Sequence, residues 1–132
     1  MSFLQSCVGF RNPAQNSDLE GIWERVGDEF EGCLIKVEHT ENELLGTIIV
    51  STPQMLSYGW AIGDKKWRRI EAGNDSGSWQ LMDLRKQYDT ANKKVLSTDY
   101  AHYWITLSGT RKLRLHQSKI PFFPAQVWRK IS

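Results

Sequence analysis

Apolar and polar residues alternate along most of the chain from residue 19 onward, with the two-residue period of half-buried β-strands. The pattern is clear over residues 33–39, where cysteine, isoleucine and valine alternate with lysine and glutamate. Over residues 112–116 two leucines alternate with Lys112, Arg114 and His116, which we expect to face solvent. The periodicity therefore predicts a protein built mainly from β-strands.

Turn signals rich in glycine, asparagine, aspartate or proline divide this pattern into short segments. We expect strands at residues 21–26, 33–39, 44–51, 66–72, 78–88, 94–107 (one bent strand or two), 112–116 and 125–131. Residues 53–63 are apolar but interrupted by two glycines, so they form either a short strand or a loop folded over a barrel mouth. No convincing amphipathic helix pattern occurs after residue 19, which argues against a nucleotide-binding α/β fold.

Tryptophans mark both ends of the strand region, in Gly21-Ile22-Trp23 and in Val127-Trp128-Arg129. This arrangement suggests that the first and last strands pair and leave no free sheet edge. We therefore predict an all-β fold, a closed antiparallel up-and-down barrel of about eight to nine strands, as a single domain over residues 19–132. Residues 1–18 form an N-terminal extension, in which residues 1–10 suit one short helical turn and residues 15–18 a polar loop.

Composition agrees with one globular domain. The chain has 132 residues, of which 40% are hydrophobic and 24% charged, so it is long enough to bury a core without a metal or disulfides. Six tryptophans are spread along the sequence, which favours a core filled from several strands. The net charge of +2 is too balanced to indicate nucleic-acid binding by itself.

The sequence contains no apolar run long enough to span a membrane as a helix, and its first residues lack the features of a signal peptide. As written the chain is expected to be cytoplasmic, or secreted or periplasmic if a signal peptide had been removed. Its two cysteines, Cys7 and Cys33, make neither a disulfide framework nor a metal site. Cys33 is expected to be a small buried residue, and a bridge between the two stays an open alternative.

The Gly-x-Trp motif at Gly21 and Trp23 resembles the opening of lipocalins and the wider calycin group. That resemblance implies a barrel-closing role for both residues, with Arg129 of the last strand packed over the tryptophan ring. Residues 19–23 and 112–129 are also similar to the two ends of a family of small bacterial lipocalin-like domains of unassigned function. Both resemblances imply a lipocalin-like barrel.

No catalytic motif for nucleotide, hydrolase or metalloprotease chemistry is present, so we assign no catalytic residue. The three histidines, His39, His102 and His116, lie far apart in the sequence and do not indicate a metal site. We expect no cofactor. The sequence favours a binding protein over an enzyme.

The leading hypothesis is a barrel that binds a small apolar or amphipathic molecule. The ligand would enter at a mouth covered by residues 58–63, with Tyr58, Trp60, Trp67 and Tyr103 as its walls. Because a barrel of about eight strands has a narrow interior, six tryptophans are also enough to fill it.

Two alternatives remain. A filled barrel would act as a protein-interaction module, with a protein partner docking on its outer face or on the aromatic loop at residues 119–124. An OB-like barrel would bind single-stranded nucleic acid through the basic run at residues 65–69, although the balanced net charge makes nucleic acid the weaker candidate.

Overall fold

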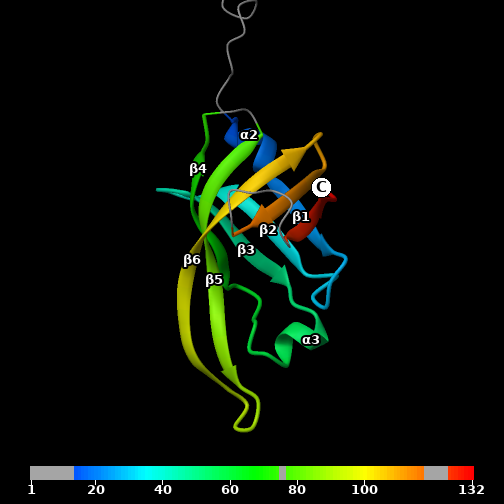
Figure 1. Cartoon of the computed structure of the whole chain (residues 1–132), viewed down its shortest axis with the longest axis vertical. Helices are drawn as coiled ribbons and strands as arrows, with labels where there is room; N and C mark the ends of the chain where they lie inside the picture. The colour runs from blue at the N-terminus through cyan, green and yellow to red at the C-terminus, as the bar shows by residue number, and fades with distance from the viewer. Residues whose placement is uncertain (1–13, 75–76, 118–124) are drawn as a thin grey trace, which may run out of the picture.

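The protein forms a closed antiparallel barrel whose eight strands follow one another in sequence order, so the predicted up-and-down topology is confirmed. The computed structural model describes residues 14–74, 77–117 and 125–132 (Figure 1). The strands are β1 (Gly21–Val26), β2 (Leu34–His39), β3 (Leu44–Val50), β4 (Lys65–Ala72), β5 (Ser78–Asp89), β6 (Lys94–Ser108), β7 (Lys112–His116) and β8 (Gln126–Lys130). Two single-turn helices, α2 (Asn16–Leu19) and α3 (Pro53–Leu56), lie at opposite ends of the barrel.

The first and last strands close the ring, as the tryptophan-bearing ends predict. β1 pairs with β8 in a register that sets Trp23 opposite Lys130 and Glu24 opposite Arg129. Directly opposed residues of an antiparallel pair point to the same face of a sheet. Lys130 therefore shares the inner face with Trp23, and its Nζ lies 5.7 Å from the centre of the Trp23 ring.

This register corrects the expectation for Arg129, which does not cover Trp23. Arg129 points outward and forms an ion pair with Glu24. The neighbouring residue, Lys130, supplies the cation over the ring. At Gly21 a Cβ would lie 2.4 Å from the Ser132 carbonyl oxygen and φ is +135°, so the close approach of β1 to the end of the chain favours glycine there.

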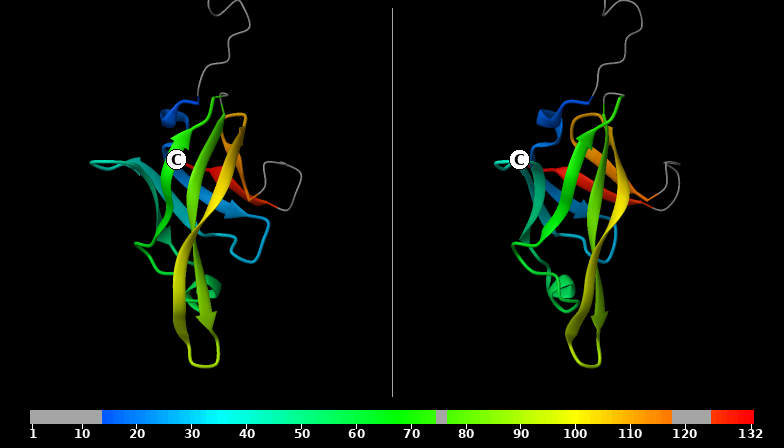
Figure 2. Two further views of the ribbon diagram at one scale, coloured as in Figure 1. Left: turned by 60° about the vertical axis from the view of Figure 1, so that its left-hand side comes forward. Right: turned by 90° about the vertical axis from the view of Figure 1, so that its left-hand side faces the viewer.

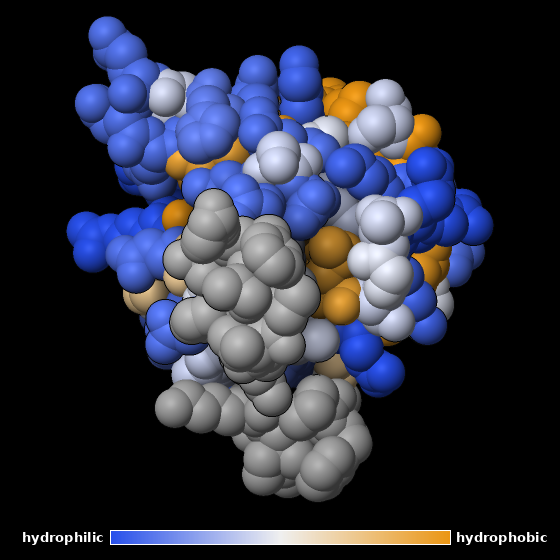
Figure 3. Space-filling view, turned by 90° about the horizontal axis from the view of Figure 1, so that it is seen from above, coloured by the Kyte–Doolittle hydropathy of each residue, from blue (hydrophilic) through white to orange (hydrophobic). Residues whose placement is uncertain are grey.

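Tryptophan side chains fill the half of the barrel next to α2. Four of the six are fully buried, namely Trp23, Trp67, Trp79 and Trp128. The rings of Trp67 and Trp128 meet edge to face with their centres 5.1 Å apart. The Trp23 Nε1 donates to the Leu19 carbonyl oxygen at 2.8 Å, which ties α2 to this end. Seen from the α2 end, the surface is mainly hydrophilic with scattered apolar residues (Figure 3).

At the other end, β5 and β6 continue past their neighbours as a two-stranded hairpin. β5 pairs with β4 only as far as Asp83, and β6 pairs with β7 only from Trp104. Residues 84–100, which we call the hairpin arm, therefore pair only with each other in the sheet and project beyond the ring (Figure 2).

Most predicted strands lie where the periodicity places them, and residues 94–107 belong to one continuous strand. Residues 53–63 instead begin with α3, because Pro53 starts a helical turn and the Thr52 Oγ1 accepts the Met55 N–H. The expected polar loop at residues 15–18 is largely the α2 turn. The helical turn expected at residues 1–10 and the docking loop expected at residues 119–124 lie outside the described residues.

His116 is buried with 3% of its surface exposed, so the expectation of an exposed position was wrong. It lies opposite Trp104 in the register, and its Nε2 is 3.0 Å from the Thr106 Oγ1. Two neighbours on β6 therefore accompany His116 at its buried position: the Trp104 side chain and the Thr106 hydroxyl. Alternation alone places His116 in solvent. In the described part of the chain, no helix has the length and apolar character needed to cross a membrane.

Replacing Trp128 tests the importance of the tryptophan core for closure. Trp128→Ala removes a fully buried ring that contacts Trp67, and we expect it to lower the free energy of unfolding by about 3–5 kcal/mol. Urea denaturation followed by circular dichroism measures the change. Arg129→Ala is the matched control, since this neighbouring side chain is exposed and should cost far less. Equal losses in the two variants would contradict a packed closure at β8.

Candidate functional site

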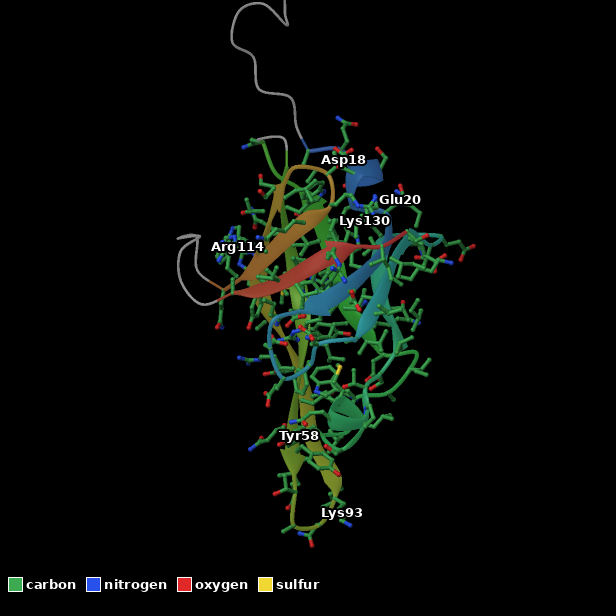
Figure 4. The ribbon with its side chains drawn as sticks, turned by 90° about the vertical axis from the view of Figure 1, so that its right-hand side faces the viewer. Asp18, Glu20, Tyr58, Lys93, Arg114 and Lys130 are labelled. Carbon is green, nitrogen blue, oxygen red and sulfur yellow. The ribbon has the colours of Figure 1, made fainter. Side chains whose placement is uncertain are left out.

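A cavity of about 520 Å³ opens at the end of the barrel that carries α3 and the hairpin arm. Figure 4 places Tyr58 at this end beside α3 and Lys93 at the tip of the arm, whereas Asp18, Glu20 and Lys130 lie toward the opposite end. The cavity is lined by Arg25, Glu29, Phe30, Met55, Tyr58, Trp60, Lys66, Asp83, Leu84, Arg85, Lys86, Tyr88, Thr90, Tyr103 and Gln126.

Aromatic rings form one side of this cavity. Phe30 and Tyr58 meet edge to face with their centres 6.3 Å apart, and Tyr58 meets Tyr88 in the same way at 6.1 Å. Tyr103 adds a further ring from β6, and all four side chains are half-buried. The site thus offers aromatic surface that is not buried in the core.

A glycine brings the loop after α3 against the hairpin arm. A Cβ on Gly59 would lie 2.6 Å from a Val95 methyl group and 3.1 Å from the Tyr88 ring, and the Gly59 φ is +85°. The Lys86 Nζ donates to the Gly59 carbonyl oxygen at 2.7 Å. These contacts hold Tyr58 next to Tyr88.

Lys66 and Asp83 form a buried ion pair where the cavity meets the core. The Lys66 Nζ donates to the Asp83 Oδ1 at 2.7 Å and to the Leu84 carbonyl oxygen at 2.8 Å. The two residues are 4% and 2% exposed. The same Nζ lies 4.7 Å from the centre of the Trp60 ring. Burial lowers the pKa of Lys66 and raises the pKa of Asp83, while each partner's charge opposes the shift.

A β-bulge explains why Lys66 faces inward. Strand β3 pairs its consecutive residues Thr47 and Gly46 with Lys65 and Trp67, so Lys66 is an extra residue on β4. An extra residue breaks strict alternation and can turn a side chain toward the other face. Lys66 and Trp67 are consequently both buried, although they are neighbours in sequence.

The other positive side chains at the cavity are also paired with carboxylates. The Arg25 guanidinium contacts Asp28 at 2.8 Å, Lys86 contacts Asp64 at 2.7 Å, and Arg85 contacts Asp99 at 2.7 Å. Arg25 and Lys86 additionally lie over aromatic rings, those of Phe30 and Trp60 respectively. The cavity therefore carries many charges but little net charge.

Three of the four predicted wall residues line the cavity: Tyr58, Trp60 and Tyr103. Trp60 contributes little open surface, because it is 8% exposed. Trp67 is completely buried against Trp128 and does not line the cavity. Its position opposite Asp83 on the inner face makes it part of the core.

Sequence reasoning missed the charged residues of the site. The basic run at residues 65–69 looked like one exposed strip, but Lys66 turns inward while Arg68 pairs with Glu43 on the outside. Asp83 carried a usable signal, since it shares the alternation that buries Leu81. Phe30 and Tyr88 gave no such signal, as they lie in a turn and at a strand end.

Cys33 is buried behind this site, as expected for a small core residue. Burial raises the pKa of its thiol to about 11 from 9.0, against the opposing charges of Arg25 and Lys66. Across residues 14–74, 77–117 and 125–132, no three histidine, cysteine, aspartate or glutamate side chains gather closely enough to hold a metal ion.

We found no match to this chain among protein-family models, curated proteins or solved structures. The interpretation of the site therefore rests on its own geometry.

Removing one member of the buried ion pair should strongly destabilise the folded protein. Asp83→Asn leaves the Lys66 ammonium without its counter-charge, and we expect a loss of about 3–5 kcal/mol in the free energy of unfolding. The matched control is Asp99→Asn, which breaks an ion pair of the same 2.7 Å length on the exposed surface and should change stability little. A mild effect of Asp83→Asn, equal to that of the control, would contradict a structural role of the pair.

The Cys33 thiol should make stability depend on pH in alkaline solution. Because its folded pKa is raised, the folded state keeps the proton that the unfolded chain releases above pH 9.0, so this stabilisation is lost between about pH 9 and 11. The total loss is about 3 kcal/mol for a difference of two pKa units. Urea titrations of the Cys7→Ser and the Cys7→Ser/Cys33→Ala proteins measure it as a difference in pH slope. Parallel slopes would contradict the burial argument.

Proposed function

We propose that the protein is a non-enzymatic, lipocalin-like barrel that binds a small amphipathic molecule in the cavity beside α3. The observation that carries the proposal is the group of half-buried rings at this end, Phe30, Tyr58, Tyr88 and Tyr103. The core fills the opposite end with tryptophan, yet these rings remain open to a cavity.

The size and lining of the cavity support this proposal. Its volume of about 520 Å³ falls within the range of roughly 300–1,000 Å³ of small-molecule sites. Such sites combine apolar walls with a few fixed polar groups. Here the rings supply the walls, and the immobile pair of Lys66 and Asp83 supplies polarity at the inner end.

The lipocalin-like assignment is supported by topology and by one end of the barrel. Eight strands in sequence order surround an interior closed at one end by Trp23, with the Lys130 ammonium over its ring. This agrees with the Gly-x-Trp resemblance, with Lys130 in the place expected for Arg129. We extend the proposal to the family of small bacterial lipocalin-like domains on the likeness of the chain ends.

The alternative functions have less support from the geometry. The basic run proposed for nucleic acid is divided between the two faces of β4, with Lys66 inside the barrel. A protein-interaction module with a filled barrel is disfavoured by the open cavity. Small-molecule binding is thus the function on which we base the experiments.

Fluorescence titration with N-phenyl-1-naphthylamine tests the proposal. We expect its emission to rise on binding and Tyr58→Ala to weaken the affinity about fivefold, because about 1 kcal/mol of ring contact is lost. Leu56→Ala is the control, since this side chain is 55% exposed, lies two residues away and does not line the cavity. Near-ultraviolet circular dichroism establishes that each variant is folded. Absence of saturable binding, or equal effects of both substitutions, would count against the proposal.

A further inference from the structure

The charges around the cavity restrict the chemistry of a ligand. We infer that the site accepts an aromatic amphiphile whose polar group is a hydrogen-bond donor, uncharged or cationic, and discriminates against carboxylates, sulfonates and phosphates. This inference rests on the proposed function, because it concerns the same cavity.

Every cation at the cavity already has a partner. Arg25, Lys66, Arg85 and Lys86 each form an ion pair with a different aspartate. The charge of each cation is therefore already balanced by an aspartate at 2.7–2.8 Å, and an acidic ligand would have to compete with that aspartate for it.

Lys66 is the most deeply buried of these four cations. An ammonium has three N–H donors. One goes to the Asp83 Oδ1, one to the Leu84 carbonyl oxygen, and the nitrogen lies 4.7 Å from the centre of the Trp60 ring. The Lys66 ammonium thus already has two hydrogen bonds and a nearby ring, so it offers little further stabilisation to a ligand carboxylate. A buried acid without a counter-charge is strongly disfavoured.

The groups that remain available suit a donor. Tyr103 lines the cavity and its hydroxyl makes no hydrogen bond within the described residues, so the hydroxyl can accept one from a ligand. Glu29 also lines the cavity and forms no ion pair within the described residues. With the four paired aspartates it makes five carboxylates against four cations, so the charge around the cavity favours a cationic ligand. The faces of Tyr58 and Tyr88 attract positive charge as well.

Three small naphthalenes that differ only in the polar group test the inference. The experiment measures how each compound displaces N-phenyl-1-naphthylamine from the full chain at 0.15 M salt. The compounds are 1-naphthylmethylammonium, the alcohol 1-naphthalenemethanol and the carboxylate 1-naphthaleneacetate. The ammonium and the alcohol should each displace the probe at a concentration at least tenfold lower than the carboxylate. Equal or tighter binding of the carboxylate would overturn the inference and leave the proposed function standing. Failure of the probe itself to bind would remove both.

Tyr103→Phe locates the polar contact. It removes one hydroxyl and keeps the ring, so it should weaken the alcohol and the ammonium about fivefold and leave 1-methylnaphthalene, which has no donor, unchanged. Tyr100→Phe is the matched control: its hydroxyl donates to the Lys65 carbonyl oxygen and it does not line the cavity. Unchanged affinities in Tyr103→Phe, or a loss as large in Tyr100→Phe, would overturn the assignment of Tyr103.

Discussion

A charge buried inside a barrel is tolerable only where a second charge and further hydrogen bonds replace the lost water. Lys66 and Asp83 meet this condition through their 2.7 Å contact and the Leu84 carbonyl oxygen. The pair lies between the filled half of the interior and the half that opens to the surface. Toward α2 the space is filled by tryptophan, with Trp67 opposite Asp83 in the register, and toward the hairpin arm it opens into the cavity. The pair therefore separates a tryptophan-filled core from a polar, accessible end.

The β-bulge on β4 makes this arrangement compatible with the rest of the barrel. Without the extra residue, a lysine next to the inward-facing Trp67 would point to solvent. A single local irregularity thus places a cation among apolar strands without disturbing the closed ring. The same cation lies near the Trp60 ring, as does Lys86, so the charged groups also fix an aromatic side chain at the cavity.

Periodicity predicted the strands, which depend on regular alternation. It failed to predict the orientation of individual side chains at the β-bulge and at the pairing of β1 with β8. The strands and the pairing of β1 with β8 follow from alternation and from the terminal tryptophans. Alternation cannot reveal a bulge, so it does not predict that Lys66 of the basic run faces the interior. It also cannot choose between Arg129 and Lys130 as the cation over Trp23, because that depends on which residue the register sets opposite.

The cavity walls come largely from segments that the ring itself does not need. The hairpin arm, the loop after α3 and the turn after β1 supply Tyr88, Tyr58 and Phe30, whereas closure depends on β1 and β8. Contacts such as that between Lys86 and the Gly59 carbonyl oxygen hold these segments together. Substitutions in them can change the shape and polarity of the site while the tryptophan core preserves the fold. In this barrel, closure of the ring and the walls of the cavity therefore depend on largely different residues, and Lys66 and Asp83 lie where the two sets meet.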